Sequence, residues 1–400
     1  VFTNFMTKFK KTFSAAAIKL KLEIFKKNVD KVTAHNAAKN MKFKLAINQF
    51  ADLSSEEFKK MYLGLKVPAS AYRALIEAKA EAENTSEAEM ASLMEIAADV
   101  EAEAEAEVEG VDKPKKKSKK ELKAEAEAAA KAAAEKAAAE KAAKEAADKA
   151  AADKAAAEKA AAEKAIADEK ASFESFKAID WVAAGKVGKV KNQGGCGSCW
   201  SYGTMATIES ALAITNGGEV PILAEQALVS CDTNNYACNG GWYTAAYNWV
   251  IKNGIFTEAN WPYKATKGTC DIETRTKSSL TISGQKYRAG SDQALYAAVT
   301  QGPAAVAVDA GYLQFYSTGL YSHVNCTNRV SHAVVLVGAG KLSAAEVTRG
   351  SNTIAAAAGD RYWLIRNSWG TTWGEKGYFR MPVTGASVCG IHTAAYNAVV

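Results

Sequence analysis

Hydrophobic and polar residues near the start of the chain follow helical and strand patterns. In residues 1–66, the segment KLKLEIFKKNVDKVTAHN spaces apolar side chains three and four positions apart with lysines on the other face, which predicts an amphipathic helix. The segment KFKLAINQFADL then alternates apolar and polar residues, as a short strand does. Serines followed by glutamates in LSSEEFKKMYLGL are a helix-start signal, so a second short helix is expected. These patterns predict a small helical unit, assigned to residues 1–68.

The pattern changes at residue 69, after which aromatic and branched side chains are rare. An acidic segment, EAEAEAEVEG, precedes a basic one, KPKKKSKK, and a five-residue near-repeat of Ala, Glu and Lys follows. These residues favour helix but give no apolar stripe to bury. Residues 69–171 are therefore expected to be a low-complexity spacer, helical or disordered.

The remaining residues, 172–400, have the pattern of a globular domain. An apolar helix is expected at 199–214, and the later runs AAVAVDA, HAVVLVGAG, YWLIRNSWG and GYFRMP are typical of strands with Gly-rich turns. Helices first and strands later indicate an α+β fold of two subdomains with a cleft between them.

The composition of the chain argues against nucleic acid as a partner and against a membrane span. The net charge of +6 is modest and mixed in sign, so nucleic acid is not expected as a partner. The sequence has no apolar run of roughly eighteen residues, so no membrane span is expected. The chain begins at Val1 rather than Met, as it would after removal of a leader.

All seven cysteines lie after residue 190. An odd number in a chain of secreted character predicts several disulfides and one leftover thiol, which invites a functional interpretation. The N-x-[ST] sequences at Asn84 and Asn325 are compatible with a secretory route and with glycosylation.

The segment GGCGSCWSYG raises the question of what Cys196 and Cys199 do. A zinc site would need a second pair of ligands, which the spacing of the other cysteines and histidines does not supply, so no metal is expected. A redox dithiol should follow a strand, whereas this motif follows a Gly/Asn-rich loop. A third interpretation is favoured: Cys199 begins a helix whose dipole stabilises a thiolate, and Cys196 forms a disulfide.

A thiolate nucleophile needs a base and a group that orients the base. His332 stands at the head of SHAVVLVGAG, where a buried strand would fix its ring. Asn367, in IRNSWGTTWG, offers a side-chain carbonyl, and Trp369 could cover a hydrogen bond there from water. Each residue alone has an ordinary structural explanation. Together with Gln193 and Cys199, they indicate nucleophilic catalysis.

About residues 178–400 resemble the papain-like cysteine proteases, most closely the cathepsin L group. The motifs that carry the resemblance are DWVAAGKVGKVKNQGGCGSCW, CNGG, NWPY, SHAVVLVG, RNSWG and CGIHTAA. His332 follows Cys199 within the roughly 130–150 residues expected for this family. Asn367 lies beyond that window, and residues 341–360 look like a surface loop inserted between two strands, which accounts for the excess.

The resemblance implies a papain-like two-subdomain fold, with a helical left part and an antiparallel, β-barrel-like right part. It implies that Cys199 is the nucleophile, that His332 forms a thiolate–imidazolium pair with it, and that Asn367 holds the ring of His332. The Gln193 side chain and the Cys199 backbone N–H would form the oxyanion hole. It also implies three disulfides: Cys196–Cys238, Cys231–Cys270 and Cys326–Cys389.

The same resemblance outlines a substrate cleft. An extended substrate would pair with the backbone of Gly240 and Gly241, near Gly197, and Trp369 would also border the substrate. The pocket for the residue two before the scissile bond, the P2 residue, would be lined by Trp242, Tyr243, Val330 and Ala394. No charge is present in that set, so a hydrophobic or aromatic P2 residue is expected. Two departures from the family are Ser331, where Asp or Asn is usual, and CWSYG in place of CWAF.

Residues 1–66 resemble, less closely, the inhibitory propeptide of these proteases. Phe25, Asn28, Val32 and Asn36 fit its helical motif, and Asn48, Phe50 and Asp52 fit the following strand motif. Ala17 and Lys21 replace the motif's Glu and Arg, so a salt bridge is expected to be missing, and Ala46 replaces a Gly. The resemblance implies that this segment blocks the cleft, in reverse direction, until it is removed at acidic pH. We also predict that the Ala-rich spacer is lost or trimmed on maturation, near residues 168–178.

The leading hypothesis is therefore the zymogen of a cysteine endopeptidase, with protein and peptide substrates and its own propeptide as inhibitor. No cofactor is expected, and the protein is expected to be a monomer in the secretory pathway, either in a lysosome- or vacuole-like acidic compartment or outside the cell. Two alternatives are a catalytically silent binding protein of the same fold and a tethering protein that acts through the spacer.

Overall fold

The computed structural model describes residues 1–80, 94–97, 149, 152–154, 156–157, 159–161, 163–347 and 356–400. The chain divides into two compact units, of which one contains Val1–Glu103 with Phe176–Val400 and the other contains Ala104–Ser175. In the second unit, residues 163–174 are helical, and Lys164 pairs with Asp168 at 2.8 Å along the helix. Much of the expected spacer lies outside the described residues.

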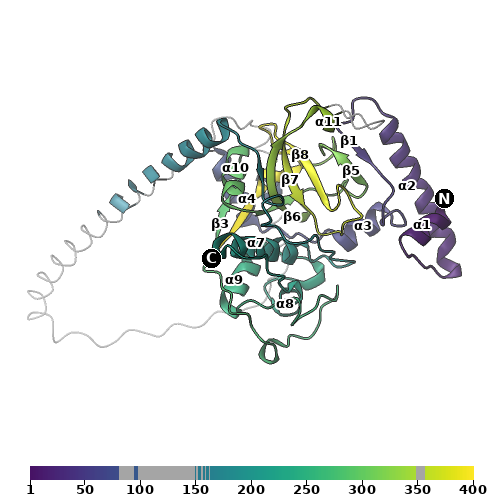
Figure 1. The fold of residues 1–400 in the computed structure, drawn as a ribbon, viewed down its shortest axis with the longest axis horizontal. Helices are drawn as coiled ribbons and strands as arrows, with labels where there is room; N and C mark the ends of the chain where they lie inside the picture. Colours follow the sequence, from purple (N-terminus) through teal and green to yellow (C-terminus); the bar gives the residue numbers. More distant parts are fainter. Residues whose placement is uncertain are drawn as a thin grey trace, which may run out of the picture. The chain divides into compact units, whose positions relative to one another are not determined.

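The N-terminal segment, residues 1–68, is mostly helical (Figure 1). Ser54 caps its third helix and accepts a hydrogen bond from the backbone of Glu57, whose side chain bonds back to Ser54. The longest helix buries Phe25, Asn28 and Val32 on one face, as its apolar spacing predicts. Its elements are α1 (Phe2–Lys8), α2 (Ala15–Ala37), β1 (Phe43–Leu45) and α3 (Ser55–Tyr62).

Asparagines on α2 hold the loops that follow it. The Asn28 amide donates to the carbonyls of Ala51 and Leu53, both at 2.9 Å, and it is buried with them. Asn36 makes two hydrogen bonds to the backbone of Leu45 in β1. These contacts provide hydrogen-bond partners for backbone groups that are not paired within a helix or a sheet.

Lys21 forms an ion pair other than the one that the propeptide motif would provide. Ala17 carries no charge, so the motif's own bridge between positions 17 and 21 is absent, as expected. Lys21 Nζ instead lies 2.8 Å from Glu57 Oε1 and 3.0 Å from Oε2, so it joins α2 to the start of α3. Lys11 pairs with Asp52 at 2.9 Å.

The first half of the C-terminal region is helical and contains two disulfides. Cys196–Cys238 and Cys231–Cys270 are both formed. Figure 1 shows α7, α8 and α9 grouped together, beside the strands of the second half. The elements are α7 (Cys199–Asn216), α8 (Glu225–Cys231), η1 (Ala237–Asn239), α9 (Tyr243–Asn253) and η2 (Ile272–Thr274).

The second half is built on one antiparallel sheet with strand order β3-β9-β4-β6-β7-β8, and β2 pairs with β6. Within the described residues this order is an open path, so the sheet is not a closed barrel. Helix α10 packs on β9 and β6. The elements are β2 (Ile179–Asp180), β3 (Gly284–Arg288), α10 (Asp292–Gln301), β4 (Ala304–Val308), β6 (His332–Lys341), β7 (Arg361–Arg366), β8 (Tyr378–Pro382), η3 (Val388–Thr393) and β9 (Ala395–Val399).

These features confirm the expected α+β arrangement of a helical half and an antiparallel half, and the antiparallel half is an open sheet rather than a closed barrel within the described residues. The third disulfide, Cys326–Cys389, ties the loop before β6 to η3, so the three bridges pair as the resemblance implies. The expected insertion, residues 341–360, begins with the last residue of β6 and ends just before β7, and it contains the short helix α11 (Ala344–Val347).

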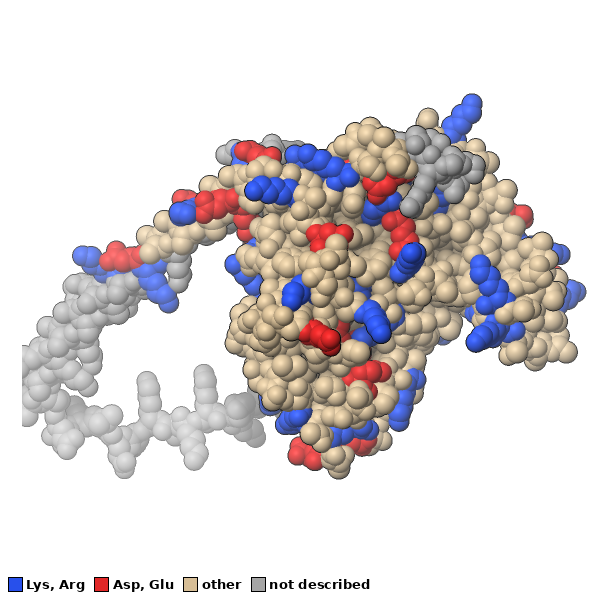
Figure 2. All heavy atoms as spheres, viewed as in Figure 1, with Lys and Arg blue, Asp and Glu red and all other residues tan. Residues whose placement is uncertain are grey.

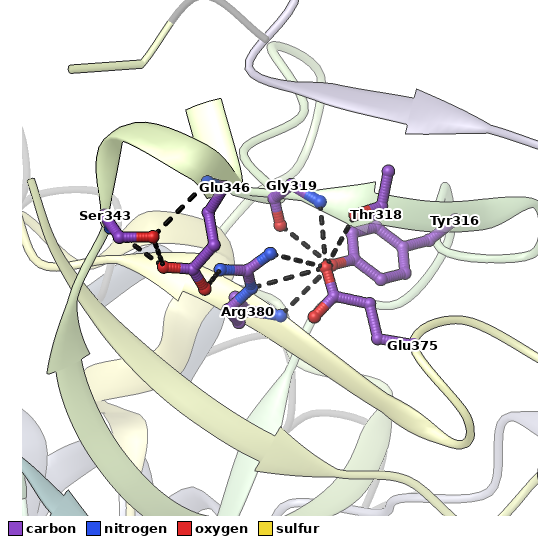
Figure 3. A network of polar contacts seen from close by, with 7 residues as sticks. All are labelled: Tyr316, Thr318, Gly319, Ser343, Glu346, Glu375 and Arg380. Atoms are coloured by element: carbon purple, nitrogen blue, oxygen red, sulfur yellow. Dashed lines mark hydrogen bonds and ion pairs between the residues drawn. The ribbon is translucent and has the colours of Figure 1, made fainter. Parts of the chain in front are cut away.

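A buried arginine links this insertion to the strand that pairs with the N-terminal segment. Arg380 on β8 lies 2.8 Å from Glu346 of α11 and 2.8 Å from Glu375 (Figure 3). The Oε1 atom of Glu375 also accepts from the backbone N–H of Gly319, in β5 (Tyr316–Gly319). Strand β5 in turn forms a two-stranded sheet with β1. The network therefore supports the edge on which the N-terminal segment docks.

Residues 69–80, which the sequence patterns assign to the spacer, form helix α4 (Ala69–Ala80). Tyr72 and Leu75 are about 1% exposed and pack with Ile96 and Ala97, and α4 contacts η3. The N-terminal end of the expected spacer therefore does bury apolar side chains, contrary to the expectation that the spacer has none to bury. The boundary at residue 69 stays a prediction.

Basic and acidic side chains are interspersed over the face shown in Figure 2. Over the described part of the chain, no helix combines the length and the apolar character that crossing a membrane requires.

We predict that Asn28→Ala lowers the free energy of unfolding by about 1–3 kcal/mol, because two buried carbonyls lose their donor. Urea unfolding of the full-length protein, followed by tryptophan fluorescence, measures this. Lys27→Ala, at the neighbouring exposed position of the same helix, is the control and should change the value by less than about 0.5 kcal/mol. Equal effects of the two variants would show that the Asn28 hydrogen bonds contribute nothing.

Candidate active site

Cys199 is the first residue of α7, and the loop before it is fixed on both sides. Cys196 is held by its disulfide to Cys238, and the Gly197 N–H donates to the Cys238 carbonyl at 2.9 Å. Ser198, the N-cap residue, makes no side-chain hydrogen bond to the helix. Among the cysteines, all of which are described, Cys199 is the free one, and it is fully buried.

His332 and Asn367 lie at the ends of the neighbouring strands β6 and β7. His332 begins β6, and Asn367 follows Arg366, the last residue of β7. His332 Nε2 lies 2.8 Å from Asn367 Oδ1, and Trp369 stacks on the imidazole at 4.6 Å between ring centroids. The Asn367 oxygen can only accept, so Nε2 carries the proton. Nδ1 is then the acceptor, and no hydrogen-bond partner faces it in the described residues.

Cys199 begins α7, which packs against β6, the strand that His332 begins. Hydrogen bonding to the backbone of Ala333, the residue after His332, and of Gly64 lowers the pKa of Cys199 against the larger effect of burial. The predicted nucleophile and the predicted base therefore begin two elements that pack together.

Gln193 reaches the same point from a separate loop. Its Nε2 donates to the carbonyl of Cys196 at 2.9 Å and to that of Tyr62 at 3.2 Å. Its Oε1 accepts from the Ser368 hydroxyl at 2.6 Å. The amide N–H groups are therefore aimed toward the residues before Cys199, and one is occupied by the N-terminal segment.

Burial disfavours the charged forms of both groups. Loss of solvent raises the pKa of Cys199 to about 11 and lowers the pKa of His332 to about 4, although the Asn367 hydrogen bond raises the latter. Both shifts favour a neutral thiol and a neutral imidazole over a thiolate and an imidazolium.

The N-terminal segment covers the site along Gly64–Lys66. The Gly241 N–H donates to the Gly64 carbonyl at 2.9 Å, and the Lys66 N–H donates to the Gly241 carbonyl at 3.0 Å, so that Leu65 and Gly241 form a parallel bridge. The Leu65 N–H donates to the Ser331 carbonyl at 3.1 Å. This segment occupies the backbone of Gly241, where substrate pairing was predicted.

Leu65 is 8% exposed and belongs to the large buried cluster that also contains Trp242, Tyr243, Val330 and Ala394, the four residues that the sequence assigns to the P2 pocket. Gly197 and Gly240 lie beside the same segment: a Cβ on Gly197 would be 3.2 Å from the Gly64 Cα, and one on Gly240 would be 2.6 Å from the Gly64 carbonyl oxygen.

Aromatic residues of the N-terminal segment cover Trp369. Phe50 and Phe58 meet its ring edge-on at 5.7 Å and 5.1 Å between centroids. The Gln49 side chain donates to the Trp369 carbonyl at 2.8 Å. Of the predicted site residues, Gln193, Gly197, Gly240, Gly241 and Trp369 thus lie against the N-terminal segment, and their roles in substrate binding stay predictions.

Sequence reasoning missed Ser368, Gly64 and Leu65. Ser368 lies inside the RNSWG motif, and its position next to Asn367 could have marked it as a candidate site residue. Gly64 is the single glycine in residues 1–66, which marks a backbone that is approached closely. In the described ranges, no group of three or more His, Cys, Asp or Glu residues is placed to hold a metal ion.

Comparisons with known proteins identify two regions. Residues 175–399 match the model of the papain family cysteine protease, and residues 2–58 match the cathepsin propeptide inhibitor domain. Cysteine proteinase 5 of Dictyostelium discoideum is 37% identical over 229 residues, covering 55% of this chain and 66% of that protein. Cysteine protease XCP2 of Arabidopsis thaliana is 30% identical over 413 residues, which cover 99% of this chain and 84% of that protein.

A solved structure resembles the whole chain. Digestive procathepsin L 3 from the larval midgut of Tenebrio molitor has a TM-score of 0.63 and 27% sequence identity, with 100% of this chain and 97% of the other covered. For several other curated relatives, the matched part of this chain spans little more than half of their length, from 53% to 59%.

We predict that Gly64→Ala uncovers Cys199, because an added Cβ would lie 2.0 Å from the Gly197 carbonyl oxygen. Gly64 is outside the left-handed region, so the effect comes from the clash alone. Alkylation of Cys199 by iodoacetamide at pH 7.5 should accelerate at least roughly tenfold in the full-length variant.

Gly218→Ala is the matched control, because a Cβ at Gly218 meets nothing within 4 Å. Its alkylation rate should equal that of the unmodified chain. If Gly64→Ala also alkylates at the unmodified rate, the N-terminal segment does not protect the thiol at this point.

Proposed function

Because the chain belongs to the papain family of cysteine proteases, we propose that it is the zymogen of a cysteine endopeptidase. One observation supports this above all: Gly64–Lys66, which follow the matched inhibitor domain, pair with Gly241 and Ser331 and lie beside Cys199, while His332 keeps its hydrogen bond to Asn367. An inhibitor that covers a thiol, a base and its orienting amide is expected when those groups react once uncovered.

Removal of the propeptide would restore water to the cleft and allow proton transfer. His332 Nδ1 takes the proton of Cys199, and the thiolate attacks the carbonyl carbon of the scissile peptide bond. The Gln193 amide and the Cys199 backbone N–H stabilise the resulting oxyanion. The imidazolium then protonates the leaving amine as the carbon–nitrogen bond breaks, which leaves a thioester on Cys199. Water, deprotonated by His332, hydrolyses the thioester and releases the second product.

The proposed substrate preference is supported by the apolar character of the covering residue. Leu65 is buried in the same cluster as Trp242, Val330 and Ala394, none of which carries a charge. A Leu, Phe or similar P2 residue would bury the same apolar surface, whereas an arginine would lose solvation without a partner.

Acidity would release the propeptide through histidines at its interface with the enzyme domain. His35 Nε2 donates to the Phe43 carbonyl, 3.1 Å away, and burial and the nearby Lys44 and Lys31 lower the pKa of His35 despite that bond. On the other side of Phe43, the pKa of His323 is lowered by burial and by Lys31 and His35, while Asp309 opposes the shift.

Protonation of this pair would favour release. His323 stacks on Tyr312 and its Nδ1 accepts from the Asn325 N–H, so a proton there breaks a hydrogen bond. Since the docked state lowers both pKa values, the released state binds more protons as the pH falls through the range below about 6.5. Acid therefore shifts the balance toward release, and the lowered pKa of His332 acts in the same direction.

The compartment is inferred from the disulfides and from acid release. Three disulfides fit an oxidising secretory route, and release by acid fits a lysosome-like compartment or secretion into an acidic medium. Asn325 is exposed in the loop before β6, so it is the described sequon available for a glycan.

The alternatives make different predictions. A catalytically silent binding protein would keep the fold without the intact His332–Asn367 pair, which this chain retains at 2.8 Å. A tethering protein would depend on the spacer, and a partner captured by residues 69–170 alone would favour it.

We predict that acidification of the full-length protein to about pH 4.5 under mild reduction yields a fragment near residues 172–400. This fragment should hydrolyse a peptide with Phe or Leu at P2, and at least roughly tenfold less of one with Arg there. Mass spectrometry and peptide hydrolysis measure both. Cys199→Ala should abolish the activity. A chain that stays inactive even after another protease removes the first 170 residues would be a pseudoenzyme.

We predict that the double variant His35→Gln/His323→Gln moves the midpoint pH of conversion down by roughly half a unit, because two groups that take up protons on release are gone. The conversion, followed by mass across a pH series, measures it. Lys27→Gln, an exposed change on the same helix as His35, serves as the control. An unchanged midpoint in the double variant would exclude this pair as the acid sensor.

A further inference from the structure

Two tyrosine hydroxyls hold the loop that carries Gln193. The Tyr202 hydroxyl donates to the Asn192 carbonyl at 3.2 Å, and the Tyr263 hydroxyl donates to the Gln193 carbonyl at 2.8 Å. The two rings meet edge-on, with centroids 5.1 Å apart. Consecutive backbone carbonyls of one loop are therefore each bound by a phenol from the helical half.

The same hydroxyls connect this loop to the residue before the nucleophile. The Ser198 Oγ lies 2.6 Å from the Tyr263 hydroxyl. Because the Tyr263 proton is directed at the Gln193 carbonyl, Ser198 is the donor in this contact. A chain of hydroxyls thus runs from Ser198, next to Cys199, through Tyr263 to the backbone of Gln193.

The rest of the loop is anchored by other contacts. The buried Lys191 ammonium lies 2.8 Å from Glu209 of α7 and 2.7 Å from Glu225 of α8. On its other side, the Gln193 N–H donates to the Ser368 carbonyl at 2.8 Å. These contacts fix the ends of the loop, and the two phenols fix its middle.

We propose that Tyr202 and Tyr263 are positioning residues of the oxyanion hole, an inference that rests on the proposed function. A preorganised donor stabilises an oxyanion only when it stays within a few tenths of an ångström of its place. Rotation of the 192–193 peptide would swing the Gln193 side chain away from the Cys199 N–H. Tyr202 is a feature of this chain, since the resembling motif CWAF has phenylalanine at that position.

The test uses Tyr202→Phe, Tyr263→Phe and the double variant, each converted from the full-length chain. Tyr296→Phe is the matched control, because Tyr296 is also a buried phenol that donates to a backbone carbonyl, that of Lys177 at 3.0 Å, and α10 contributes nothing to the site. Peptide hydrolysis gives kcat and KM. The rate of Cys199 alkylation by iodoacetamide reports the thiolate alone, since that displacement forms no oxyanion.

We expect kcat to fall roughly tenfold in each single variant and up to about a hundredfold in the double variant, with KM and alkylation unchanged. The affinity for a peptide aldehyde, which forms a hemithioacetal with an oxyanion-like oxygen, should fall in parallel with kcat. Unchanged kcat, or alkylation that falls together with kcat, overturns this inference. If the unmodified enzyme is inactive, both the proposed function and this inference are overturned. If the unmodified enzyme and Tyr296→Phe are active while this inference fails, the proposed function still stands.

Discussion

The site depends on how closely helix α7 approaches the sheet. Gly203, one turn after Cys199, faces β4 and β6: a Cβ there would lie 2.9 Å from the Tyr243 ring and 3.7 Å from the Cβ atoms of Ala305 and Ala333. Small residues on both sides let the start of the helix lie against the sheet. This contact brings a thiol from the helical half to the backbone beside His332. A larger side chain here would force the two halves apart, because packed interiors leave no free volume to absorb it.

The same close packing suits the proposed inhibition by the propeptide. Gly64 has no side chain, so its backbone passes close over Gly197, and Leu65 joins the buried cluster beside it. Cys199 and His332 are then fully buried, which disfavours their charged forms. Under the proposed function, inhibition would need no change in the His332–Asn367 hydrogen bond, which is already made.

The local features of the site could be predicted from the sequence, whereas the contacts between distant segments could not. A helix that begins at Cys199, a strand that begins at His332 and the Ser54 cap each follow from a few adjacent residues. The ion pair of Lys21 with Glu57 joins positions that no periodic pattern relates, so the sequence indicated a missing bridge instead. Helix α4 was overlooked for a similar reason: Tyr72 and Leu75 are too few apolar residues to make a stripe, and tertiary packing buries them.

The long insertion between β6 and β7 raises the question of why it leaves the site intact. The pairing of these strands runs from Lys341↔Arg361 at the insertion to Val335↔Arg366 near the site, so the register fixes Asn367 relative to His332 whatever the loop length. The entropic cost of closing a loop grows only slowly with its length. The insertion also returns Glu346 to Arg380, which adds a contact at the open end of the hairpin. The sequence distance from Cys199 to Asn367 can therefore exceed the family's usual value without moving the amide, because strand register, not chain length, sets its position.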